Sequence, residues 1–314
     1  MSTGYFSHPD CRQHDAGSWH PESPARLQAI DDQLIASRIA NLIEHHHAAP
    51  ADLAMVERNH SASAIARVVD NLPTDKHAGW YEIDGDTLLN SDSLKAALAA
   101  VGAAVAATDA VIAGQLANAF CAIRPPGHHA TPSTSMGFCL FNNVAIAAHH
   151  AMAVHGLERI AIVDFDVHHG NGTQESFKDD PRVLMASFFQ HPLYPYSDHT
   201  ESRPGLHNMV NVPLAAFSNG DVVRDAVSQH WLPALHAHRP QMIFISAGFD
   251  AHREDDLGQM GLVEADYAWL TQQIMAVAAQ HSQGRIVSCL EGGYNLSALG
   301  RSVVAHLTAL AELG

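Results

Sequence analysis

The feature that most constrains this chain is a repeated order of apolar segment, polar loop and helical segment. Five apolar segments are expected to be strands, at residues 119–123, 160–165, 183–188, 242–247 and 286–290. Segments with helical periodicity lie between and around them, near residues 91–115, 142–155, 219–237, 264–281 and 296–312. Apolar strands that alternate with helices are typical of a parallel sheet covered by helices on both faces. We therefore expect an α/β fold.

The N-terminal part is expected to begin with helices. Ser23 as N-cap and Pro24 at the first helical position predict the start of one helix. Its buried face is expected to contain Leu27, Ile30, Leu34 and Ile35. Shorter helices are expected at residues 51–58 and 61–72, and either Ser91 or Ser93 is expected to cap the long Ala-rich helix that follows.

Length and composition favour one large globular unit over residues 1–314. A chain with 47% hydrophobic and 16% charged residues can bury a sizeable core, and no linker or repeat divides it. The formal net charge of −16 argues against a nucleic-acid partner and mildly favours cationic substrates. The run His45–His47 has no carboxylates at ligand spacing, so we expect it on the surface or at a strand edge.

Cysteine usage and hydropathy bear on the location of the protein. The four cysteines are scattered and form no CxxC pair, which favours a reducing, cytoplasmic compartment: Cys11, Cys121, Cys139 and Cys289. The Ala-rich segment from Ala96 contains Thr108 and Asp109 before it reaches membrane length, and the N-terminal residues lack a basic start followed by an apolar run. We expect neither membrane insertion nor secretion.

Each expected strand ends in a polar loop. In open α/β sheets ligands bind beyond the carboxyl ends of the strands, so these loops are expected to meet in one crevice. The densest loop follows the strand in IAIVDFDVHHGNG, where Asp164, Asp166 and His168 alternate and would project to one side of an extended chain. Carboxylate and imidazole ligands around an open position are typical of a catalytic zinc site. The other loops contribute His128, His129, Asp250 and Tyr294.

The chain resembles the histone deacetylase family, in its class II and bacterial amidohydrolase-like branch. The resemblance rests on the motifs HPESPARL, RPPGHHA, GFCLFNN, DFDVHHGNG, GFDAH and EGGYN, in this order along nearly the whole chain. It implies the arginase–deacetylase fold as a single domain. It also implies zinc-dependent hydrolysis of the amide of acylated amines, chiefly ε-N-acetyl-lysine in proteins or peptides, with release of acetate.

The resemblance implies a metal site and an oxyanion donor. Asp166, His168 and Asp250 match the ligands of one catalytic zinc ion. Zinc in such a site polarises a carbonyl and lowers the pKa of water. Tyr294 matches the tyrosine whose hydroxyl stabilises the developing oxyanion.

The resemblance also implies a histidine pair with distinct partners. His129 matches the general base and His128 its neighbour, whose orienting carboxylate is Asp164. Asn171 stands where class I enzymes carry an aspartate beside the general base. An amide orients the ring without adding charge, so we expect His129 to be less basic than it would be beside a carboxylate.

Substrate contacts follow from the same resemblance. Gly137 and Phe138 match one wall of the acyl-lysine tunnel, and Tyr194 matches the opposing aromatic wall. Asp86 matches the acid at the rim of the tunnel. Arg26 is expected either behind the site, where acetate leaves, or in a surface ion pair.

Two departures from the family pattern affect specificity. Leu257 stands where polyamine deacetylases carry a gatekeeper glutamate, which weakens the expectation of a polyamine substrate. The loop SFFQHPLYPYSD departs from the usual pattern at the tunnel mouth, at Phe189, Gln190, Tyr196, Ser197 and Asp198.

The family also binds one or two potassium ions. The first would be held by the Ser187 hydroxyl and by backbone carbonyls, those of Asp164, Asp166, His168 and Phe188. The second would be held at Phe177, Asp180 and Val183.

Other functions stay open beside the acetyl-lysine hydrolase. One is an acetylpolyamine or other small acyl-amine amidohydrolase. A ureohydrolase with two manganese ions would need further carboxylates, but His168, Gly170 and His252 stand at the neighbouring positions. A non-catalytic acyl-lysine binding module would be expected to have lost a ligand, a histidine or the tyrosine, and all are present. The oligomeric state is left open.

Overall fold

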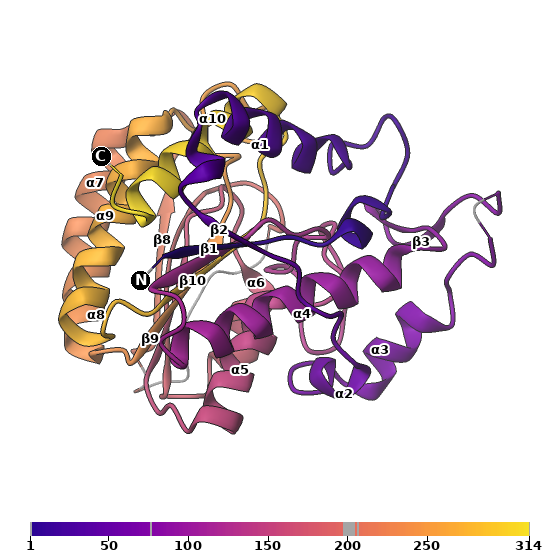
Figure 1. Cartoon of the computed structure of the whole chain (residues 1–314), viewed down its shortest axis with the longest axis horizontal. Helices are drawn as coiled ribbons and strands as arrows, with labels where there is room; N and C mark the ends of the chain where they lie inside the picture. The colour runs from indigo at the N-terminus through magenta and orange to yellow at the C-terminus, as the bar shows by residue number, and fades with distance from the viewer. Residues whose placement is uncertain (1, 76, 197–204, 206, 314) are drawn as a thin grey trace.

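A computed structural model describes residues 2–75, 77–196, 205 and 207–313 (Figure 1). Its core is an eight-stranded sheet in which every neighbouring pair is parallel. The spatial order is β2 (Glu44–His46), β1 (Thr3–Phe6), β5 (Asn118–Cys121), β10 (Ile286–Leu290), β9 (Met242–Ala247), β6 (Ile160–Asp164), β7 (Val183–Gln190) and β8 (Met209–Leu214). The expected α/β fold with a parallel sheet is confirmed.

All five expected strands are present, and three further strands of this sheet escaped the sequence analysis. The strands β2 and β8 lie at the two edges and are only partly buried, so they lack a continuous apolar run. The strand β1 is buried but only four residues long. The expectation of strand-edge histidines is confirmed, because His45 and His46 lie in β2. A separate antiparallel hairpin, β3 (Tyr81–Asp84) and β4 (Thr87–Leu89), was also not expected.

Helices cover both faces of the sheet (Figure 1). One layer contains α1 (Ala25–Ala36), α7 (Gly220–Ala226), α8 (Leu232–His238), α9 (Glu264–His281) and α10 (Leu296–Leu310). The other contains α4 (Ser93–Ile112), α5 (Asn143–His155) and α6 (Asn171–Phe177), with α2 (Leu53–Val56) and α3 (Ala62–Val69) beyond α4. Short helical turns complete the described elements: η1 (Pro9–Arg12), η2 (Ile39–Asn41) and η3 (Val227–Trp231).

The start of α1 differs from the expectation. The helix begins after Pro24, without a side-chain cap, so Ser23 is not its N-cap. Ile35 is 68% exposed, and the expectation that it is buried is wrong. The other three apolar positions of the helix are buried as expected and belong to the main hydrophobic core.

Two other helices also differ from the expectation. Asp92, not a serine, precedes α4, and Ser93 Oγ instead accepts a hydrogen bond from Asn90 N. The single helix expected at 219–237 is divided by the π-helical turn η3. Pro233 lies just after that turn and has no amide hydrogen, so the regular helical hydrogen-bond ladder cannot continue through it.

The helix α4 includes Thr108 and Asp109 and ends at Ile112, a few residues before the expected end near residue 115. By length and composition alone it is long enough and apolar enough to cross a membrane, with a mean hydropathy of 1.6. However, 72% of that stretch is buried inside the protein, as in the core helix of a globular protein. Gly102 lets the helix approach closely, because a Cβ there would lie 2.2 Å from the carbonyl oxygen of Ala49.

Candidate active site

Four adjacent central strands carry the polar loops to one edge of the sheet. In space they lie in the order β5, β10, β9, β6, although β10 is the last strand in the sequence. Their carboxyl ends lead directly to His128 and His129, to Tyr294, to Asp250, and to Asp166 and His168. The structure thus brings together the residues that the sequence analysis assigned to separate loops.

The three proposed zinc ligands converge at the centre of this edge. His168 Nδ1 lies 3.1 Å from Asp166 Oδ1 and 3.2 Å from Asp250 Oδ2. Ligand atoms held at normal bond lengths around a tetrahedral zinc ion are separated by about 3.3 Å. Asp250 Oδ2 is buried, and within the described residues it accepts no hydrogen bond of normal geometry. Two carboxylate oxygens, one of which is Asp250 Oδ2, and one imidazole nitrogen fit a single zinc ion with an open position.

Backbone groups hold the two carboxylates against each other. Gly292 N donates to Asp166 Oδ2 at 2.9 Å, and Val167 N donates to Asp250 Oδ1 at 2.9 Å. A Cβ at Gly292 would lie 2.0 Å from Asp250 Oδ2, so only glycine fits there. Burial, and then the Asp166 carboxylate, raise the pKa of Asp250 to about 6. A bound cation would relieve the repulsion between these two buried carboxylates.

The histidine pair lies beside the ligands, with ring centroids 4.0 Å apart. His128 Nδ1 is 3.0 Å from Asp164 Oδ2, and His129 Nδ1 is 2.8 Å from Asn171 Oδ1. Asp164, one of three alternating candidates in the sequence, therefore lies behind a histidine and not among the converging ligand atoms. Asn171 lies beside His129, where the family resemblance had assigned it.

The two histidines have opposite pKa shifts. Burial lowers the pKa of His128, but the carboxylates of Asp166 and Asp164 outweigh burial and raise it well above the usual value. Burial lowers the pKa of His129 well below the usual value, and the neighbouring His128 lowers it further. A pair of titratable groups with separated pKa values is typical of an acid and a base that act together.

Glu291 is a site residue that the sequence analysis missed. Its buried carboxylate accepts hydrogen bonds from Gly127 N at 2.6 Å, His128 N at 3.1 Å and Ser246 Oγ at 3.1 Å. It therefore positions the loop that carries the histidine pair. The sequence feature that could have identified Glu291 is its position directly after β10, at the same edge of the sheet as the other polar residues.

Arg26 lies behind the site and is completely buried. Its Nε donates to the carbonyl oxygen of Gly293 at 2.7 Å, and its guanidinium lies over the Tyr294 ring, 4.9 Å from the centroid. It also pairs with the buried carboxylate of Glu22, which Arg124 contacts from the other side. The alternative of a surface ion pair for Arg26 is wrong.

Burial raises the pKa of Tyr294 well above its usual value, so its hydroxyl remains a hydrogen-bond donor at neutral pH.

The expected tunnel walls lie around the ligands. Phe138 packs edge-on against Tyr294, with centroids 5.8 Å apart, and Tyr194 packs edge-on against His129, with centroids 5.0 Å apart. Gly137 has a φ of +57°, and a Cβ there would lie 2.5 Å from the His129 ring, so the wall requires glycine.

The rim residues lie farther from the ligands. Asp86 connects to the tunnel wall through Thr87, whose Oγ1 donates to Asp86 Oδ1 and accepts a hydrogen bond from Phe138 N. Leu257 is half-buried, and its N donates to the Asp255 carboxylate, which also accepts from Tyr294 N.

The unusual loop is described only in part. Phe189 and Gln190 are the buried last residues of β7, and Phe189 packs against His169. Tyr196 is 75% exposed. Ser197 and Asp198 lie outside the described residues.

The groups of the first expected potassium site lie together. Asp164 and Ser187 are paired in register between β6 and β7, and Phe188 is the next residue of β7. All three residues are completely buried. The neighbouring strands thus bring these groups to the same edge as the proposed metal ligands.

The three carbonyls of the second expected potassium site are contacted by a side-chain amide in this structure. The side-chain nitrogen of Asn208 donates to the carbonyl oxygens of Phe177, Asp180 and Val183, at 2.9, 3.0 and 3.1 Å. The three oxygens that would hold the ion therefore already converge on an amide. This substitution of an amide for an ion had no signal in the sequence, because Asn208 lies on a different segment from the three carbonyls.

Comparison with known proteins agrees with this arrangement. The sequence profile of the histone deacetylase domain matches residues 20–310. The histone deacetylase-like amidohydrolase of Pseudomonas aeruginosa is 37% identical over 288 residues, which cover 90% of this chain and 74% of that protein. Histone deacetylase 14, chloroplastic, of Arabidopsis thaliana is 37% identical over 309 residues, which cover 93% of this chain and 73% of that protein.

The fold is shared as well as the sequence. The crystal structure of the HDA15 HD domain aligns with a TM-score of 0.92 and 32% identity, over 99% of this chain and 88% of that chain. The matched range includes the histidine pair, the three converging ligands and Tyr294. On its sequence and on its arginase–deacetylase fold, the chain belongs to the histone deacetylase family of hydrolases.

Proposed function

We propose that this protein is a zinc-dependent hydrolase of N-acylated amines, with ε-N-acetyl-lysine in proteins or peptides as its main substrate class. The observation that carries this proposal is the three-ligand cluster of Asp166, His168 and Asp250 beside two histidines with opposite pKa shifts. Such a combination suits hydrolysis, because water must lose a proton and the leaving amine must gain one.

Each side chain has a defined task in this reaction. Zinc at the three ligands would supply a Lewis acid for the carbonyl oxygen and for the attacking water. His129 is neutral, since its pKa is lowered, and accepts the proton of that water at Nε2, while Nδ1 stays with Asn171. It then delivers the proton to the leaving nitrogen, which gives a free amine and acetate. His128 stays protonated, and its positive charge stabilises the negative charge that develops during the reaction.

The tunnel walls support a lysine-length substrate. Two aromatic walls that face the site bury the methylenes of an acyl-lysine stem, and each buried methylene contributes about 0.8 kcal/mol. Asp86 at the rim is a suitable acceptor for a backbone amide of a peptide substrate. Arg26 lies behind Tyr294, on the side where acetate would leave.

A panel of substrates tests this proposal. The purified zinc form is assayed with acyl-lysine peptides of different acyl length and with acetylated polyamines. We expect the highest kcat/KM on an acyl-lysine peptide. A preference for acetylpolyamines would favour the alternative small-amine amidohydrolase, to which Glu254 and Asp256 near the rim would contribute negative charge. Binding without turnover of any substrate would favour the non-catalytic module.

Leu257→Glu is expected to shift this preference toward acetylpolyamines. The half-buried Leu257 carries no charge, and a carboxylate there would attract the distal ammonium of a polyamine. We expect the ratio of the kcat/KM value for the polyamine to that for the peptide to rise by about tenfold or more. A tenfold rise corresponds to about 1.4 kcal/mol of additional transition-state stabilisation for the polyamine. Leu257→Gln is the matched control, because it has similar size and no charge. An unchanged ratio in Leu257→Glu would contradict the assignment of Leu257 as gatekeeper.

We also propose one potassium ion, at Ser187 and Phe188, and not two. The amide of Asn208 supports this count, because it already satisfies the carbonyls of the second site.

Asn208→Ala tests this count. It is expected to destabilise the protein by about 1–3 kcal/mol, because buried carbonyls lose their donor. Potassium should then restore part of that stability, measured as the rise in Tm when KCl replaces tetramethylammonium chloride at equal ionic strength. For the wild type we expect a smaller rise in Tm, because it has only one potassium site. Two potassium ions bound to the wild type would contradict the proposal.

We propose further that the chain is a single domain in the cytoplasm, with no nucleic-acid or membrane partner. The net charge of −16 and the four free, buried cysteines support this proposal. A ureohydrolase with two manganese ions is disfavoured, since His252 Nε2 points to Glu264, at 3.6 Å, and not toward the zinc ligands.

A further inference from the structure

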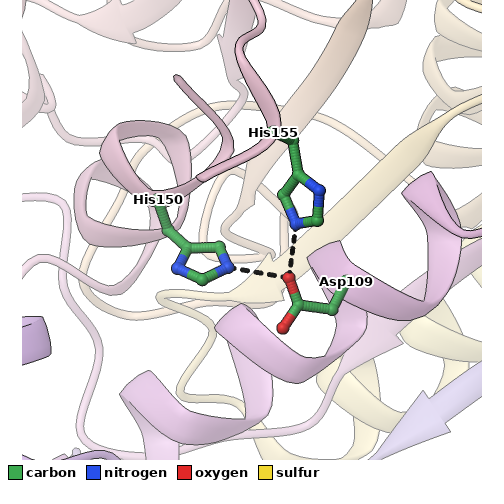
Figure 2. Close-up of side chains that lie close together, drawn as sticks. All are labelled: Asp109, His150 and His155. Carbon is green, nitrogen blue, oxygen red and sulfur yellow. Dashed lines mark hydrogen bonds and ion pairs between the residues drawn. The ribbon is translucent and has the colours of Figure 1, made fainter. Parts of the chain in front are cut away.

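A second group of metal-ligand residues lies outside the active site. Figure 2 shows His150 and His155 with both rings directed at the carboxylate of Asp109. Their Nε2 atoms lie 2.7 and 2.6 Å from the same oxygen, Oδ1. The ligand atoms of all three residues lie within 4.8 Å of one another. This group and the active-site ligands are the two such groups within the described ranges.

The group sits at the opposite edge of the sheet from the active site. Asp109 is in the last turn of α4, and His150 and His155 are in the C-terminal half of α5. These helices lead into β5 and β6, whose carboxyl ends carry the catalytic loops. Because a connecting helix returns antiparallel to its strands, its C-terminal end lies at the edge where the next strand begins. The group is therefore remote from the proposed zinc ligands.

Its electrostatic surroundings favour a cation. The C-terminal ends of both helices carry partial negative charge from unpaired carbonyls. Burial raises the pKa of Asp109, but hydrogen bonds from His155 and His150 outweigh it and lower the pKa, so the carboxylate is ionised at neutral pH. The formal net charge of −16 adds a general attraction for cations.

The exposure of the three side chains gives an ion access. The side chain of His150 is 7% exposed, that of His155 25% and that of Asp109 49%. One ligand, His150, is thus held by the core, while about half of the Asp109 side chain faces solvent, from which an ion can reach the three ligand atoms. The open side allows water to complete the coordination.

We propose that Asp109, His150 and His155 bind one first-row divalent cation, with zinc as the best match, and that this ion links α4 to α5. Two imidazole nitrogens and one carboxylate oxygen suit Zn²⁺, Co²⁺ or Ni²⁺, whereas Mg²⁺ and Ca²⁺ prefer oxygen ligands only. The ion stabilises the packing of the two helices and takes no part in the hydrolysis.

The test is metal binding to the zinc-loaded enzyme. Protein with one zinc equivalent, verified by elemental analysis, is titrated with Zn²⁺ and separately with Co²⁺ by calorimetry. We expect one further ion per chain and a rise in Tm when it binds. His155→Gln and Asp109→Asn change partly exposed residues and are expected to weaken this second binding by more than about tenfold, since even the loss of an outer partner of a ligand typically costs 10–100-fold.

Two controls separate this site from the active site. The variants His155→Gln and Asp109→Asn are expected to keep the first zinc equivalent and the wild-type rate of hydrolysis. His230→Ala, which changes an exposed helical histidine elsewhere, is expected to bind the second ion as the wild type does. The proposal is overturned if the wild type binds no second ion, which would leave the group as a hydrogen-bonded trio. It is also overturned if His155→Gln and Asp109→Asn bind that ion as tightly as the wild type.

Discussion

Asp250→Ala is expected to remove the catalytic zinc ion and to lower the rate of amide hydrolysis by on the order of 10³-fold or more. The physical reason is that Asp250 supplies one of only three converging ligands, and its buried Oδ2 accepts no hydrogen bond of normal geometry within the described residues. The remaining pair, Asp166 and His168, lie two residues apart on one loop and cannot surround an ion. Zinc content by elemental analysis and kcat/KM on an acetyl-lysine peptide measure the two effects.

The matched control for this prediction is Asp256→Ala. Asp256 is an exposed acid on the same loop, six residues further along, and no role is assigned to it at the ligands. This control is expected to retain one zinc equivalent and near wild-type activity. Circular dichroism checks that both variants are folded. Zinc at full stoichiometry in Asp250→Ala would show that the ligand assignment is incorrect.

Tyr294→Phe is expected to lower kcat by about 10²–10³-fold while zinc remains bound. The tyrosine follows the two glycines after β10, and its ring is held between Phe138 and the guanidinium of Arg26. Since phenylalanine keeps the ring and these contacts, the variant removes only the hydroxyl that would donate to the developing oxyanion. The measurement is kcat at saturating acyl-lysine peptide, together with zinc content.

Tyr194→Phe provides the comparison for this loss. It also removes a hydroxyl from an aromatic wall, but the Tyr194 hydroxyl is buried and has no hydrogen-bond partner within the described part of the chain. Loss of an unpartnered hydroxyl is nearly neutral, so we expect a change in kcat well below tenfold. Equal effects of the two substitutions, or a near-normal kcat for Tyr294→Phe, would remove the oxyanion role of Tyr294.

The central strands could be predicted from the sequence because their residues are buried on both faces. β9 and β10 have the expected bounds, and β5, β6 and β7 differ by at most two residues at an end. Edge strands are partly solvated and have no such pattern, which is why β2 and β8 were missed. The turn η3 was missed because the loss of one amide donor at Pro233 changes the helix type without changing the apolar periodicity.

The residue types of the site could be predicted from the sequence, but not which of these residues contact one another. The alternation of Asp164, Asp166 and His168 left open which of them are ligands. The structure answers this locally, because Asp164 lies 3.0 Å from the His128 ring and Asp250 arrives from a neighbouring strand. Asn208 had no local signal, and the position of Glu291 directly after β10 did not reveal its partners, since the roles of both residues consist of contacts with segments far away in the chain.

The sequence by itself determined the strands, the polar residues that end them and the family motifs, because these depend on local patterning. Only the tertiary structure decided that β10 inserts between β5 and β9, and hence that Tyr294 and Glu291 join the histidine loop. It likewise brought Asp109 to the two histidines of α5. The reason is that strand order and helix packing follow from burial of whole surfaces against one another, which no local stretch of sequence encodes.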